Sequence, residues 1–145
     1  MTLYNLGFMT EKDVIAWADE QLLKEAENFD HISLLSLKGP SYCLKLPSYE
    51  FPRPREFSFT EEFALRTKIL DLASEDEKQR FLKWVSLEFM GRDIDIPEVH
   101  FGYLIDHYFF ECDDLAYANS FLEEQLNTLI PKNEKVADEI WASIA

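Results

Sequence analysis

Residue types that can ligate a metal ion come together late in the sequence. His107 and Glu111 are four residues apart and would share a helix face, with His100 two turns earlier and Cys112 next to Glu111. Zinc sites, however, show closer ligand pairs and draw ligands from a second element, and a histidine on an aromatic helix is more often a packed boundary residue. We therefore predict no metal and no cofactor, and keep a small metal-dependent enzyme as an alternative.

A cysteine beside a histidine and an acid is also the arrangement of nucleophilic catalysis. Cys43 lies in an aromatic stretch, and Cys112 precedes two aspartates. Nearby carboxylates disfavour the thiolate, which is the reactive form of cysteine. Both cysteines are therefore interpreted as packed side chains, and no residue is predicted to be catalytic. A thiol-dependent enzyme that uses His100, His107 and Cys112 is the alternative.

Carboxylate pairs and phosphate-binding loops give no sharper signal. Pairs such as Asp93 with Asp95 are expected by chance when 28 of 145 residues are acidic, so they do not predict a glycosidase. The four glycines form no phosphate-cradling pattern. Nucleotide binding by a standard loop is therefore not expected.

The charge of the chain indicates the class of its partner. The 28 acidic and 14 basic residues give a formal net charge of −14. Residues 93–145 hold twelve of the acids against Lys132 and Lys135, whereas residues 31–60 have more basic than acidic side chains. Such a field repels nucleic acids and anionic membranes and speeds association with basic proteins. We predict a basic protein partner, no nucleic acid and no membrane; the alternative is that acidity serves only solubility.

We predict that the acidic stretch from Asp93 to Asp114 is the partner-binding surface. It surrounds an aromatic helix, and an apolar centre with a charged rim is the layout of many interfaces. Near the chain end, a tryptophan could also dock on a partner. The alternative is that the aromatics face inward and the acids only cap helices. The predicted partner-binding residues are Asp93, Asp95, Glu98, Asp106, Glu111, Asp113, Asp114 and Trp141.

The elements that would position these residues are predicted to be helices. Thr10 and the charged residues after it are typical of a helix N-terminus, and apolar residues at helical spacing continue for about five turns. A second, short helix ends at Gly39 and Pro40, so the two form a hairpin. Residues 40–57 contain four prolines among several aromatics, which predicts an ordered loop.

Further helices are predicted in the rest of the chain. Ser58 or Thr60 begins one and Ser74 begins the next, because each can cap a first turn. Pro97 fits the first turn of a third, although residues 99–105 also alternate well enough to form a strand.

Two more helices complete the chain. The first begins at Asp113 or Asp114 and ends at Pro131, and the last spans residues 136–144.

Together these elements predict an all-α fold, an irregular bundle of about seven helices in a single domain over residues 1–145. The cysteines lack disulfide or metal spacing, and the sequence opens without a signal-peptide pattern. No apolar run reaches the roughly 18 residues of a membrane span. We therefore expect a cytoplasmic location.

The first forty residues resemble small acidic bacterial immunity proteins of polymorphic or contact-dependent toxin systems. The resemblance is carried by Leu6–Thr10 (LGFMT), by Asp13–Asp19 (DVIAWAD) and by the leucine-rich helix that follows. It implies a protein that binds one cognate toxin domain, such as a basic nuclease, and neutralises it. It carries over no catalytic residue. A helical adaptor or structural subunit is a further alternative.

Overall fold

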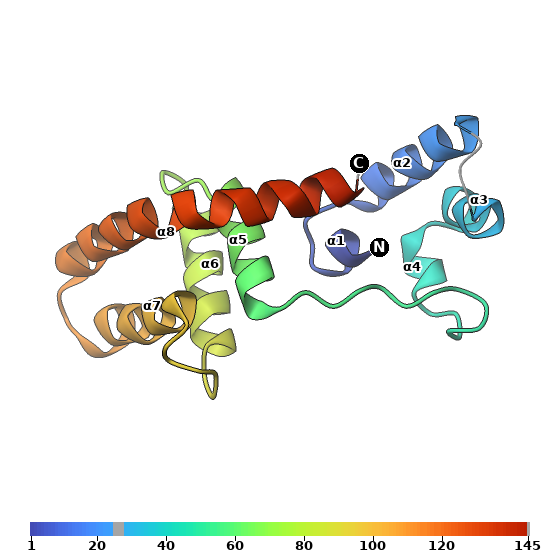
Figure 1. Cartoon of the computed structure of the whole chain (residues 1–145). Helices are drawn as coiled ribbons and strands as arrows, with labels where there is room; N and C mark the ends of the chain where they lie inside the picture. The colour runs from blue at the N-terminus through green and yellow to red at the C-terminus, as the bar shows by residue number, and fades with distance from the viewer. Residues whose placement is uncertain (25–27, 145) are drawn as a thin grey trace. The chain divides into compact units, whose positions relative to one another are not determined.

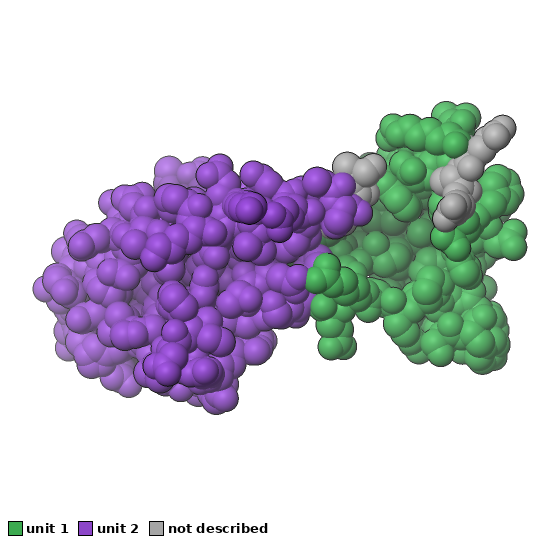
Figure 2. Space-filling model, in the orientation of Figure 1, with its two compact units in different colours: residues 1–56 green, residues 57–145 purple. Residues whose placement is uncertain are grey.

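The computed structural model describes residues 1–24 and 28–144 and is all-helical (Figure 1). These residues form eight α-helices and one π-helix and contain no strand, which confirms the predicted all-α class. The chain divides into two compact units, Met1–Glu56 and Phe57–Ala145 (Figure 2). That residues 1–145 form a single domain stays a prediction. No helix in the described part of the chain has the length and apolar character needed to cross a bilayer.

The first unit begins with helices whose ends the sequence marks clearly. Its helices are α1 (Thr2–Asn5), α2 (Glu11–Leu23), α3 (Phe29–Lys38) and α4 (Pro40–Cys43). Thr10 caps α2, because its hydroxyl accepts from the Asp13 N–H at 3.3 Å while the Asp13 carboxylate accepts from the Thr10 N–H at 2.8 Å. Gly39 ends α3 at a φ of 77°, a conformation that glycine adopts without strain. Helix α2 is shorter than predicted, since it ends at Leu23.

The hairpin of α2 and α3 encloses a small core. Ser36 on α3 donates a hydrogen bond to Asp19 on α2. The predicted loop at 40–57 begins with the single turn of α4 and adds one aromatic anchor to this core, Phe51, whereas Tyr49 is 85% exposed. The buried core residues of this unit are Val14, Ala18, Ile32, Leu35, Cys43 and Phe51.

The second unit contains the predicted functional segment. Its elements are α5 (Phe59–Ile69), α6 (Glu75–Glu88), α7 (Pro97–Asp106), the π-helix η1 (His107–Glu111) and α8 (Leu115–Ile144). Ser58 caps α5 with a full capping box, whereas Ser74 caps α6 with only half of one, because Glu77 accepts from the Asp71 N–H instead. Residues 99–105 are helical, so the strand alternative is wrong.

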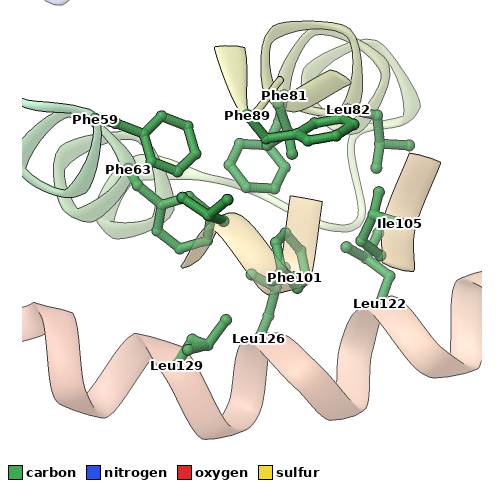
Figure 3. Close-up of a cluster of buried hydrophobic side chains, with 12 residues drawn as sticks. Phe59, Phe63, Phe81, Leu82, Phe89, Phe101, Ile105, Leu122, Leu126 and Leu129 are labelled. Carbon is green, nitrogen blue, oxygen red and sulfur yellow. The ribbon is translucent and has the colours of Figure 1, made fainter. Parts of the chain in front are cut away.

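An aromatic cluster forms the core of the second unit (Figure 3). Phe63 is fully buried at its centre, with ring centroids 5.7 Å from Phe81 and 5.5 Å from Phe101. Edge-to-face pairs of this kind add stability beyond the area they bury. Helices α5, α6 and α7 thus all contribute aromatic rings to the cluster, and Leu122, Leu126 and Leu129 of α8 lie against them.

Helices α6 and α7 approach each other at a position without a side chain. A Cβ atom added to Gly102 would lie 2.6 Å from the Cβ atom of Phe89. Phe89 is buried and also contacts Tyr103, with ring centroids 4.4 Å apart. The glycine therefore sets how closely α7 packs on the end of α6.

We expect Gly102→Ala to lower the free energy of unfolding by about 1–3 kcal/mol, because the new methyl group must displace Phe89 in a packed core. Intrinsic helix propensity alone would predict the opposite sign, a gain of about 1 kcal/mol. Urea unfolding of the wild type and the variant, followed by circular dichroism, decides between the two. A stabilised variant would show that the helices are not in close contact here.

Helix α8 corrects the prediction that one helix ends at Pro131 and another begins at residue 136. It runs without interruption from Leu115 to Ile144 with Pro131 inside it. The missing proline N–H costs one backbone hydrogen bond. Tertiary contacts offset this cost, since α8 packs against α5 and Lys68 of α5 forms an ion pair with Asp138 beyond the proline. The buried stripe continues across the proline at Ala118, Leu122, Leu126, Leu129, Asn133, Ala137 and Ile140.

Pro131 is exposed, so its replacement leaves the core unchanged. We expect Pro131→Ala to raise the free energy of unfolding by about 2–3 kcal/mol. The gain is the cost of a proline inside a helix, less the smaller amount by which proline lowers the entropy of the unfolded chain. Urea titration measures the change. No gain would indicate that residues 127–135 do not form a regular helix in solution.

Candidate functional site

The predicted partner-binding segment forms one helix with a turn at each end. Residues 93–96 make a turn closed by a hydrogen bond from the Ile96 N–H to the Asp93 carbonyl at 3.2 Å. Helix α7 follows, with Pro97 at its first position, where the absent N–H costs nothing. Phe101 and Ile105 anchor α7 in the core. The segment is therefore positioned by its own aromatic and aliphatic residues.

Most of the predicted acidic residues are on the surface. Asp106 is half-buried, and Glu98 is buried with 8% exposure. Glu98 offers a partner little surface because its position shares a helix face with Phe101, Gly102 and Ile105, which pack inward. The exposed acids are Asp93, Asp95, Glu111, Asp113 and Asp114.

Two of these acids also have structural roles. The Asp93 carboxylate accepts a hydrogen bond from the Asp95 N–H at 3.0 Å, which stabilises the turn before α7. The Asp114 carboxylate accepts from the Tyr117 N–H at 3.0 Å and caps α8. Among the described residues, the Asp95 and Asp113 carboxylates accept no such hydrogen bond, so the capping alternative accounts for only part of the acidic stretch.

The acidic stretch contains no lysine or arginine to neutralise it. In α5 and α6, acids pair with neighbouring cations, as in Glu62 with Arg66 at 2.6 Å and Glu88 with Arg92 at 3.2 Å. From residue 93 to residue 131 the sequence has no lysine or arginine. In the parts of the chain that the structure describes, Asp95 and Asp113 form no ion pair with a lysine or arginine.

Large apolar side chains are exposed among these acids. Phe110 is 59% exposed, and Leu115 and Tyr117 are 62% and 51% exposed. Tyr117 is held by Tyr108, with ring centroids 5.1 Å apart. Burial of such side chains by a partner would contribute to association in proportion to the area covered. The aromatic residues up to Phe110 predict apolar surface here, whereas Leu115 and Tyr117 were not predicted to contribute to it.

Burial and a neighbouring carboxylate together shift the pKa of one group in the stretch. Partial burial raises the pKa of Asp106, and the Glu111 carboxylate raises it further. Both effects disfavour the charged form of Asp106. The folded state is therefore penalised when Asp106 is ionised.

The sign of this effect predicts how a neutral substitution acts. Because the pKa of Asp106 is raised in the folded state, its ionised form destabilises the fold by the full amount above the folded-state pKa. This destabilisation disappears as the pH falls below the pKa of Asp106 in the unfolded state. We expect Asp106→Asn to raise the free energy of unfolding at pH 7, and this gain to vanish in acid. Denaturant unfolding of the wild type and the variant, from pH 7 down into acid, measures this difference in the free energy of unfolding. A gain that is independent of pH would assign the effect to packing instead.

The end of α7 widens into η1 and brings His107, Glu111 and Cys112 together. His107 Nδ1 lies 2.6 Å from a Glu111 carboxylate oxygen, and His107 Nε2 lies 3.4 Å from Cys112 Sγ. The Cys112 N–H donates to the His107 carbonyl at 3.1 Å, which is the i to i+5 bond of a π-turn. His100 is exposed and contacts none of these three side chains through a described hydrogen bond.

The metal-dependent alternative gains no support from this geometry. Within residues 1–24 and 28–144, no three His, Cys, Asp or Glu side chains converge to hold a metal ion. His107, Glu111 and Cys112 instead form a chain in which His107 is the middle member.

Trp141, the last of the predicted partner-binding residues, is half-buried, and its indole nitrogen is buried without a hydrogen-bond partner in the described residues.

A cavity of about 480 Å³ lies in the first unit. Trp17 and Phe51 contribute aromatic surface to it, and Arg53 and Arg55 contribute positive charge. This is the locally basic part of the sequence. Its charge is opposite to that of the 93–114 stretch, so the two sites would attract ligands of different sign.

Comparison of the chain with protein-family models, with curated proteins and with solved structures found no match.

Proposed function

We propose that this chain is an immunity-type protein that binds a basic toxin domain stoichiometrically and neutralises it. The observation that carries the proposal is the set of exposed acids in residues 93–114, a stretch without lysine or arginine, together with the exposed apolar side chains Phe110, Leu115 and Tyr117 that adjoin its C-terminal end in the sequence. The resemblance of the first forty residues to immunity proteins supports the same role. Metal, cofactor and catalytic residues have no part in it.

Charge and apolar surface have separate tasks in such a complex. Unpaired carboxylates attract a cationic surface from a distance, which raises the association rate and makes it depend on salt. Within the contact, side chains such as Phe110 and Tyr117 supply the area whose burial slows dissociation. A basic nuclease fits this surface, because its cationic substrate site must already hold a phosphate backbone.

Asp95→Lys with Asp113→Lys is the variant that tests the surface. Neither side chain caps a turn or helix, so the pair can be reversed with little effect on the fold. Glu50→Lys with Glu56→Lys is the matched control, because both residues are exposed in the first unit, outside the 93–114 stretch, and their reversal changes the net charge equally. The two variants separate a local surface from the effect of total charge.

Affinity capture from the cell of origin uses the tagged wild type and both variants at about 50 mM and about 500 mM salt, which spans strong and weak screening. We expect a single basic protein on the wild type and on the control, released by high salt and absent from Asp95→Lys with Asp113→Lys. Titration of the captured protein then gives a 1:1 complex whose affinity falls at least tenfold in the double reversal. An equal loss of affinity in both variants would contradict the assignment of this surface. Capture of no basic protein by the wild type would contradict the proposed function.

A further inference from the structure

The contacts of His107 fix the direction of its hydrogen bonds. An ionised carboxylate only accepts hydrogen bonds, so His107 Nδ1 donates its hydrogen to Glu111 across the 2.6 Å contact. In the neutral ring, Nε2 then carries the lone pair and accepts from the Cys112 thiol 3.4 Å away. Nucleophile, base and orienting acid are thus linked in the order that activates a thiol.

The π-turn is what creates this linkage. In a regular α-helix, residue 111 would follow residue 107 on the same face, and residue 112 would point elsewhere. Because the turn contains one extra residue, the Cys112 N–H donates a hydrogen bond to the His107 carbonyl at 3.1 Å. Cys112 then leaves the helix in an extended conformation. His107 can therefore contact position 111 through one ring nitrogen and position 112 through the other.

The site is open to small molecules. The side chains of His107 and Glu111 are 51% and 64% exposed, and Cys112 is half-buried. The other cysteine differs in every respect: Cys43 is 1% exposed, and burial raises the pKa of its thiol. Cys112 is thus accessible and hydrogen-bonded to a base, whereas Cys43 is buried.

We propose that Cys112 is an activated thiol that forms mixed disulfides with uncharged or cationic low-molecular-weight disulfides. The thiol proton moves to His107 Nε2, and the thiolate attacks one sulfur of the disulfide. A new sulfur–sulfur bond forms as the original one breaks, and the leaving thiolate takes the proton from His107. Cys112 is oxidised to the mixed disulfide, and the reagent is reduced to one free thiol.

The surroundings of Cys112 determine which disulfides it accepts and where the reaction stops. Glu111, Asp113 and Asp114 are its neighbours in the sequence, and Asp106 is close enough to Glu111 to interact with it, so these carboxylates repel anionic reagents. Buried Cys43 offers no accessible thiol to attack the product. The mixed disulfide therefore persists until an external thiol removes it. This reaction does not depend on the proposed toxin partner.

The test measures the modification of each cysteine of the full-length protein by bis(2-hydroxyethyl) disulfide at pH 7, using mass spectrometry of peptides after a timed acid quench. His107→Gln removes the base, Glu111→Ala removes the orienting acid, and His100→Gln is the matched control on an exposed histidine of the same segment. We expect Cys112 to react at least about tenfold faster in the wild type than in His107→Gln, since a positioned base supplies rate in this range or above. Glu111→Ala should fall between them, and His100→Gln should equal the wild type.

A second comparison needs no variant and covers the case in which one fails to fold. In the folded wild type, Cys112 should react faster than in denaturant, whereas Cys43 should react only after unfolding. A His107→Gln rate within about twofold of the wild type would overturn the proposal, because base catalysis exceeds this range. A Cys112 rate that is no higher in the folded protein than in denaturant would also overturn it.

Discussion

The close approach of α6 and α7 at Gly102 is the contact on which the second unit depends. Without a side chain at this position, Phe89 can lie directly against the α7 backbone, and Phe101 reaches the rings of Phe63 and Phe81. Helix α8 closes this cluster from one side (Figure 3). Because α7 is fixed by its inner face, its ends and the turns beside it are free to carry side chains that contribute nothing to the core.

Local chemistry allowed much of the fold to be predicted from the sequence. The caps at Thr10 and Ser58 depend on residues within one turn, and both are present as expected. Pro131 was misjudged because a backbone preference of a few kcal/mol was outweighed by packing along α8. Which preference prevails depends on contacts between residues far apart in the sequence, and these are not visible in a local pattern.

The site shows the same division between local and tertiary information. The acidity of the 93–114 stretch is a property of composition and was evident at once, and the burial of Glu98 could have been inferred from its spacing to Phe101 and Ile105. The π-turn had no such signal, since one extra residue in a helix has no distinctive sequence. His107 and Cys112 were singled out for their types, but only the turn brings their side chains together.

The absence of lysine from residues 93–131 has a consequence for covalent chemistry. Modifications of the lysine amine, such as acetylation and ubiquitin attachment, have no target among residues 93–131 themselves, whereas Lys83 and Lys135 elsewhere in the unit are exposed. The charge of this stretch therefore cannot be altered by lysine modification. Along this stretch, Cys112 offers a thiol through which a disulfide-linked group could be added reversibly next to Asp113 and Asp114.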